Sequence, residues 1–101
     1  MNIKATNIEL TEEITDYVKK RIASIEKFIK DGSMNGYIEI GKTTNHHKQG
    51  DVYKAELDIR INGKKFFAKV SGFDLYSSID DAKEEIVRQI THNKEFDFDL
   101  Y

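Results

Sequence analysis

The sequence predicts an α+β domain with the element order β-α-β-β-β-α. Three observations predict it: two segments whose apolar residues recur at helical spacing, a segment over Tyr53–Ile61 in which apolar and polar residues alternate, and an Asn-Gly pair directly after that segment. Two amphipathic helices can cover one face of a four-stranded sheet. A chain of 101 residues has room for one compact domain of this kind.

The first two expected elements are a strand over Ile3–Ile8 and a helix after it. Thr11 is typical of a helix N-cap because its hydroxyl can accept a hydrogen bond from a free amide of the first turn. Two glutamates follow it, where negative charge meets the positive end of the helix dipole. The Asp31-Gly32 pair is expected to end this helix, because glycine readily takes the left-handed conformation that closes many helices. The apolar stripe consists of Ile14, Tyr17, Val18, Ile22, Ile25, Phe28 and Ile29.

Three further strands are expected over Tyr37–Lys42, Val52–Ile61 and the segment after Asn62-Gly63, with a polar loop over residues 43–51. Asn-Gly is the strongest short hairpin signal, and a two-residue turn there pairs Ile61 with Lys64. This register places the apolar residues of both strands on one face and opposite charges on the other. It also pairs Ile59 with Phe66, Leu57 with Ala68, Ala55 with Val70, and Glu56 with Lys69.

A second helix is expected after Asp74, which is a good N-cap. Its apolar stripe consists of Leu75, Ile79, Ala82, Ile86 and Ile90. A right-handed crossover through the first helix makes the first two strands parallel, and the other strands form an antiparallel meander. Both helices then run in the same direction, so their C-terminal ends lie at the same end of the domain.

The charge of the chain is unevenly distributed. The net charge is −2, but the last seven residues carry three acidic and no basic residues, so the rest of the chain has 16 basic and 15 acidic residues. We therefore expect a domain over residues 1–94 and an acidic, aromatic tail over residues 95–101. Lys19–Lys30 contains five basic residues and one acidic residue. Topology would join these to Arg88, His92 and Lys94 in one phosphate-binding surface.

Structural explanations for these basic residues remain open. Basic residues near a helix C-terminus complement the dipole, and Glu85 and Arg88 have the spacing of an ordinary helical ion pair. Arg21 lies nearly in line with the apolar stripe, so its stem must cover the edge of the core while the guanidinium projects outward.

Several classes of function are disfavoured. The chain has no cysteine, and the adjacent residues His46 and His47 fit a solvated loop better than a metal site. The acidic residues gather where helix capping explains them, and no nucleotide-binding glycine pattern is present. We therefore expect no catalytic residue, no metal and no cofactor. No segment has the length of a membrane span and no signal peptide precedes the domain, so the expected location is the cytoplasm.

Two segments resemble a known family. Ile8-Glu9-Leu10-Thr11-Glu12, the run from Val18 to Arg21, and Ile25-Glu26-Lys27-Phe28 resemble the first helix of ribosome hibernation-promoting factors and ribosome-associated translation inhibitors. Asp74-Leu75-Tyr76-Ser77-Ser78-Ile79-Asp80, followed by Arg88-Gln89-Ile90, is similar to the D-x-Y-x-x-I-D and R-Q-L signature of that family. The resemblance covers about residues 2–94. It implies the family fold, which is similar to the double-stranded RNA-binding domain.

The resemblance implies a non-enzymatic function. Such proteins bind the small ribosomal subunit and its ribosomal RNA near the decoding centre, block messenger and transfer RNA, and silence translation under stress or in stationary phase. Neither a membrane nor DNA is an expected partner. The family often has lysine where this chain has Ser24, Glu85 and His92, which implies a thinner basic patch. Together, charge and resemblance give an expected RNA-binding set of Lys20, Arg21, Lys27, Lys30, Arg88, Gln89, His92 and Lys94.

Long members of the family carry a second domain that pairs whole ribosomes. This chain resembles a short form or the N-terminal domain of a long form, so we expect pairing to need a helper factor or a route other than that domain. Two alternatives remain. One is a general binder of structured RNA that uses the same helix ends. The other is a protein–protein adaptor that uses the outer face of the sheet around Phe67.

Overall fold

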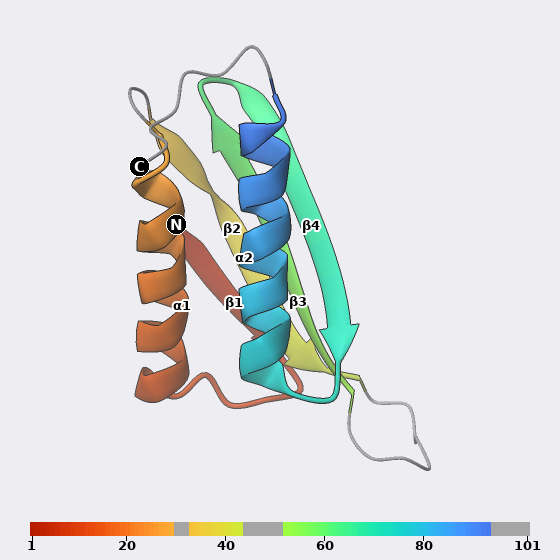
Figure 1. Cartoon of the computed structure of the whole chain (residues 1–101). Helices are drawn as coiled ribbons and strands as arrows, with labels where there is room; N and C mark the ends of the chain where they lie inside the picture. Colours follow the sequence, from red (N-terminus) through yellow and green to blue (C-terminus); the bar gives the residue numbers. More distant parts are fainter. Residues whose placement is uncertain (30–32, 44–51, 94–101) are drawn as a thin grey trace.

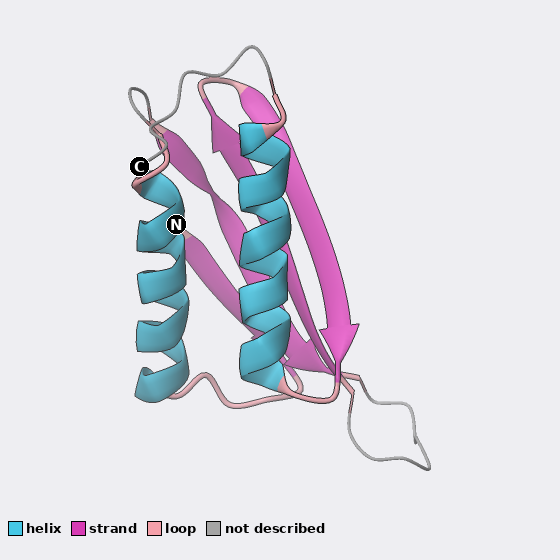
Figure 2. Ribbon diagram, viewed as in Figure 1, coloured by secondary structure: helices cyan, strands magenta, loops and turns pink. Residues whose placement is uncertain are grey.

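The structure is a computed structural model, and it describes residues 1–29, 33–43 and 52–93. A four-stranded sheet with the order β1-β2-β3-β4 carries both helices on one face (Figures 1 and 2). The predicted α+β element order is confirmed. Its elements are β1 (Asn2–Thr6), α1 (Glu12–Glu26), β2 (Met34–Lys42), β3 (Tyr53–Ile61), β4 (Lys64–Gly72) and α2 (Leu75–Thr91).

The strand pairing follows the predicted topology. β1 and β2 are parallel, and β3 pairs antiparallel with both β2 and β4. Asn62 and Gly63 have φ values of 51° and 82°, the left-handed conformation that a tight hairpin turn requires at both central positions. Every predicted β3–β4 pair is confirmed, including Ile61 with Lys64 and Glu56 with Lys69.

Both predicted N-caps are present. The Thr11 side chain accepts a hydrogen bond from the Ile14 amide, and the Asp74 side chain accepts one from the Ser77 amide. The start of each helix could thus be predicted from one residue and its local chemistry.

Three element boundaries differ from the prediction by more than one residue, and β1 and β3 begin at Asn2 and Tyr53, each one residue from the predicted start. α1 ends at Glu26, not at Asp31-Gly32, because the amides of Phe28 and Ile29 bond to carbonyls three residues back and close the helix with a tighter turn. Residues 31 and 32 lie outside the described residues. β1 ends at Thr6, not at residue 8, because Asn7 has a φ of 61° and turns the chain out of the strand.

β2 begins at Met34, three residues before the predicted start. The three additional residues that pair with β3 include Gly36, which has a φ of 143° and lies opposite Ile59. A Cβ at this position would lie 2.0 Å from the Asp58 carbonyl oxygen, so only glycine allows the two backbones to approach this closely. Periodicity could not reveal this start, because the apolar alternation is weak there.

The core lies between the sheet and the two helices. All five residues of the predicted α2 stripe are buried, whereas on α1 the buried residues are Val18, Ile22 and Ile25. The sheet contributes Ile38, Ile40, Ala55, Leu57, Ile59, Ile61, Phe66 and Ala68. Burial of this much aliphatic surface is the main term that stabilises the domain.

α1 and α2 run in the same direction, and their C-terminal ends lie at the same end of the molecule (Figure 1). This is the arrangement that the crossover argument predicted. The predictions about His46, His47 and the tail over residues 95–101 lie outside the described residues. Over the described part of the chain, no helix is long and apolar enough to cross a membrane.

Candidate nucleic-acid interface

Six of the eight predicted RNA-binding residues lie in the described part of the chain. Those on the first helix side are Lys20, Arg21 and the C-cap Lys27; those on the second are Arg88, Gln89 and the C-cap His92. Arg21 and Gln89 are partly buried, and the other four are exposed. Lys30 and Lys94 lie outside the described residues. The helix directions bring the C-terminal groups of both helices to one end of the domain.

Arg21 takes part in a cluster that joins the two helices. Its Nε lies 2.6 Å from Asp80 Oδ1 on α2, and its Nη2 donates to the Tyr17 hydroxyl at 2.9 Å. The Tyr17 hydroxyl lies 2.7 and 2.8 Å from the two Asp80 carboxylate oxygens and donates to them. The guanidinium also stacks over the Tyr17 ring, 4.6 Å from its centroid. One carboxylate on α2 therefore holds two side chains of α1.

The environment of this cluster keeps Arg21 charged and Tyr17 protonated. The hydrogen bond with the Tyr17 hydroxyl, and then the charge of Asp80, raise the pKa of Arg21. Partial burial raises the pKa of Tyr17 above its ordinary value, against the lowering effect of the Arg21 hydrogen bond. Arg21 remains 39% exposed, so its remaining N–H groups can still meet a ligand from solvent.

The D-x-Y-x-x-I-D motif has a structural role at each of its polar positions. Asp74 caps α2. Tyr76 packs edge-on against Tyr17, with ring centroids 4.7 Å apart and an interplanar angle of 83°. Asp80 closes the polar cluster with Arg21. The motif therefore starts α2 and fixes it against α1, which sets the spacing of the two basic helix ends.

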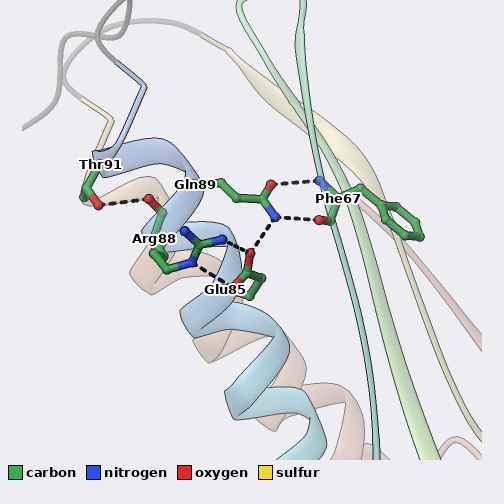
Figure 3. A network of polar contacts seen from close by, with 5 residues as sticks. All are labelled: Phe67, Glu85, Arg88, Gln89 and Thr91. Atoms are coloured by element: carbon green, nitrogen blue, oxygen red, sulfur yellow. Dashed lines mark hydrogen bonds and ion pairs between the residues drawn. The ribbon is translucent and has the colours of Figure 1, made fainter.

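Arg88 forms an ion pair within its own helix (Figure 3). Its Nε and Nη2 donate to the two carboxylate oxygens of Glu85, at 2.9 and 2.5 Å. The hydrogen bonds from Arg88, with a further one from Gln89, lower the pKa of Glu85 to about 2. The helical ion pair that the spacing of Glu85 and Arg88 indicated is present.

Gln89 connects α2 to the outermost strand of the sheet. Its Nε2 donates to the Phe67 carbonyl at 2.8 Å, and its Oε1 accepts from the Phe67 amide at 3.2 Å (Figure 3). Phe67 lies on the edge strand β4, whose outward backbone groups face no other strand among the described residues. The side-chain amide satisfies one such pair of groups in place of a fifth strand.

Because of these contacts, most of the unneutralised positive charge at the helix ends comes from lysines. Arg21 and Arg88 each face a carboxylate, whereas Lys20 and Lys27 have no ion-pair partner among the described residues. Sequence reasoning also missed Lys83, which lines a shallow pocket of about 190 Å³ together with Arg21, Asp80 and Glu84. Its spacing of three from Asp80 was the signal that could have placed it on the face toward α1.

No constellation typical of a metal centre or of catalysis is found among the described residues. No group of three or more histidine, cysteine, aspartate or glutamate side chains gathers there to hold a metal ion. The polar clusters are ion pairs and helix caps. What the arrangement can do chemically is present positive charge, at a fixed spacing, to phosphate groups.

Comparison with known proteins identifies relatives along most of the chain. A family model described as sigma 54 modulation protein / S30EA ribosomal protein matches residues 1–96. The ribosome hibernation promoting factor of Escherichia coli strain K12 is 24% identical over 96 residues, covering 94% of this chain and 93% of the relative. The ribosome hibernation promotion factor of Picosynechococcus sp. is 30% identical over 96 residues, and this chain matches 49% of its length.

Solved structures share the fold. The N-terminal domain of Thermus thermophilus Protein Y superposes with a TM-score of 0.71 at 24% identity, covering 87% of this chain and 90% of that domain. A ribosomal subunit interface protein from Coxiella burnetii gives a TM-score of 0.62 at 15% identity, covering 90% of this chain and 94% of that chain. At these identities the likeness establishes the α+β fold. The evidence that the chain is related to these proteins comes from the family match.

Proposed function

The chain belongs to the family described as sigma 54 modulation protein / S30EA ribosomal protein, and on this premise we propose that it is a ribosome hibernation factor. In this role it binds the ribosome and silences translation. We further propose that it binds the small subunit near the decoding centre, through ribosomal RNA, and blocks messenger and transfer RNA there. Its relatives named as ribosome hibernation factors support the role.

The observation that carries the RNA-binding proposal is the shared end of the two helices. Exposed Lys27 follows α1, and exposed His92 follows α2. Lys20 adds a further exposed charge one turn and a half before the end of α1. A double-helical RNA is recognised mainly through its phosphates and shape. Two basic helix ends that lie at the same end of the domain are suited to contact such phosphates.

The arginines can contribute to this surface without leaving their carboxylate partners. A guanidinium carries five N–H donors, and Glu85 engages only Nε and Nη2 of Arg88. Nη1 is then left to donate to a phosphate. The expected contact set therefore retains both arginines, with the lysines supplying most of the net charge. Lys30, Lys94 and the domain boundary at residue 94 remain predictions, because residues 30 and 94–101 lie outside the described residues.

The mechanism that fits this surface is occlusion. A rigid domain seated in the messenger and transfer RNA channel excludes both by occupying their place, so inhibition needs no chemical step. We accordingly propose that the protein is not an enzyme, that it works in the cytoplasm with the ribosomes, and that neither a membrane nor DNA is its partner. Inhibition should then be stoichiometric with ribosomes.

Co-sedimentation with purified small ribosomal subunits tests the proposal. The Lys20→Glu/Lys27→Glu variant should lose binding, because two attractive charges become repulsive, and its thermal midpoint should stay close to that of the wild type. A matched control is Lys65→Glu/Lys69→Glu, which makes the same charge change on two exposed lysines of β4. Equal loss of binding in both variants would show a general charge effect and contradict the helix-end surface.

The same assay separates the alternatives. A general binder of structured RNA should be displaced from small subunits by naked duplex RNA at similar concentrations, whereas a hibernation factor should not. An adaptor that uses the outer sheet face should lose binding in the Phe67→Ala variant and keep it in the helix-end variant. The family match favours the hibernation factor over both.

A further inference from the structure

Two large apolar side chains are exposed at the N-terminal ends of the helices. Phe73 immediately precedes the N-cap of α2 and is 65% exposed, and Leu10 immediately precedes the N-cap of α1 and is 37% exposed. An apolar residue at this position often packs against the fourth residue of the helix, which fixes the entry of the chain. Here the fourth residues are Thr15 and Ser78, and the Ser78 hydroxyl donates to the Asp74 carbonyl. The usual structural explanation for Phe73 and Leu10 therefore does not apply.

A groove opens beside Phe73. It has a volume of about 380 Å³ and is lined mainly by apolar and aromatic side chains from the β1–α1 connection, the first turn of α1, the start of β3 and the start of α2. The lining residues are Ile8, Ile14, Tyr53, Phe73, Asp74, Leu75 and Tyr76. Its size suits one or two large side chains. It lies at the end of the molecule opposite the basic helix ends (Figure 1).

Among the residues that the structure describes, the surroundings of this groove are acidic. Glu9, Glu12 and Glu13 are exposed on the connection to α1 and on its first turn, next to the lining residues Ile8 and Ile14. Of the lysines at the neighbouring strand ends, Lys54 is ion-paired with Glu39, and Lys42 is half-buried. Phosphates would be repelled here, so an aromatic side chain at this place is poorly suited to stacking on RNA. Positive charge beside an apolar group is what this surface complements.

We propose that the Phe73 groove binds a protein segment that carries an apolar or aromatic side chain flanked by lysine or arginine. The apolar side chain enters the groove against Phe73, Ile8 and Tyr53. The basic residues on either side of it lie against the glutamates of the β1–α1 connection and of the first turn of α1. This surface is separate from the helix-end surface and does not depend on the ribosomal role.

A fluorescence titration tests the groove directly, because the chain contains no tryptophan. The probe is a short peptide with one tryptophan between lysine and arginine residues, so its emission reports only on the peptide. Entry of the indole into an apolar groove should shift the emission to shorter wavelength and saturate. Phe73→Ser should weaken this binding at least about tenfold, as loss of a central aromatic anchor does at other interfaces.

The matched control is Phe67→Ser, which removes another exposed aromatic, 42% exposed, from the outer face of the sheet. It should change peptide affinity by less than about twofold. Glu12→Gln/Glu13→Gln should weaken binding and flatten its salt dependence. If Phe73→Ser binds the peptide as tightly as the wild type, the proposal is overturned.

A parallel titration with a labelled oligouridine tests whether the groove binds nucleic acid in place of a protein segment. If Phe73→Ser lowers oligouridine binding and leaves peptide binding unchanged, the groove is a nucleic-acid surface and the proposal is wrong. Neither titration contains ribosomes, so failure here leaves the hibernation role untouched. Failure of co-sedimentation with small subunits, in turn, leaves this groove untouched.

Discussion

Replacing Glu85 by lysine changes the proposed RNA-binding surface where an acidic residue neutralises one of its arginines, Arg88. The carboxylate of Glu85 engages Arg88 through two hydrogen bonds and also accepts one from Gln89. Glu85→Lys removes this acceptor, releases the guanidinium of Arg88 and places a new ammonium about one and a half turns before the end of α2. The local charge rises by two, and Gln89 keeps its two bonds to the Phe67 backbone.

The size of the effect follows from counterion release. Each new phosphate contact steepens the dependence of log affinity on log salt by about 0.7 to 0.9. Two contacts, one from the released Arg88 and one from the new ammonium, should steepen the slope by about 1.4 to 1.8. The advantage of Glu85→Lys over the wild type should therefore shrink roughly tenfold between 50 and 200 mM salt.

The assay is equilibrium binding of labelled protein to purified small subunits at several salt concentrations. Glu9→Lys is the control, because it makes the same charge change at the opposite end of the domain, where Glu9 is exposed. It should leave the slope close to that of the wild type. Parallel salt slopes for Glu85→Lys and the wild type would refute the reasoning, since they would mean that the C-terminal end of α2 does not meet phosphate.

Three further outcomes are expected. Ile86→Ala should lower the free energy of unfolding, measured by urea denaturation, by about 2 to 5 kcal/mol, because Ile86 is fully buried against the sheet and the truncation leaves a cavity. A smaller loss would mean that neighbouring core side chains move in and fill the cavity. The hydrogen bond from Arg88 lowers the pKa of Glu85 to about 2 from an ordinary value of 4.5, so its contribution to stability is complete above pH 4.5 and is lost as the pH falls through about 2. The difference in thermal midpoint between wild type and Glu85→Gln should thus narrow over that range; a constant difference would argue against the ion pair. Gln89→Ala should speed amide exchange at Phe67 and promote self-association through β4, seen by sedimentation velocity; unchanged exchange at that amide would show that the contact is weak in solution.

The parts of the fold that could be predicted are those with a local physical cause. The β3–β4 register follows from the Asn62-Gly63 turn and the alternation on both sides of it, since a shift by one residue would expose the whole apolar face. The helix starts follow from Thr11 and Asp74, whose side chains satisfy amides within three residues. The direction of both helices then follows from the handedness of the crossover.

The parts that could not be predicted depend on residues far apart in the sequence. Arg21 was expected to point to solvent, and nothing near it shows that Asp80, 59 positions later, would lie within 2.6 Å. Gln89 was assigned to RNA because the family resemblance implied it, and its bonds to the backbone of an edge strand depend on tertiary packing. The early start of β2 likewise depends on a backbone contact that only Gly36 permits.

The two proposed surfaces have a common cause in the topology. A right-handed crossover makes β1 and β2 parallel. The meander then reverses the chain twice, at β3 and at β4, so β4 runs parallel to β1 and α2 runs in the same direction as α1. Acidic residues are favoured at the start of a helix and basic residues at its end. Here Glu12 and Glu13 lie in the first turn of α1 and Arg88 in the last turn of α2, so the aligned helices place the two charge signs at opposite ends of the domain. Antiparallel helices would have mixed them. An acidic, apolar end with Phe73 and a basic end with Lys27 are therefore expected together, and a variant that strengthens one surface need not weaken the other.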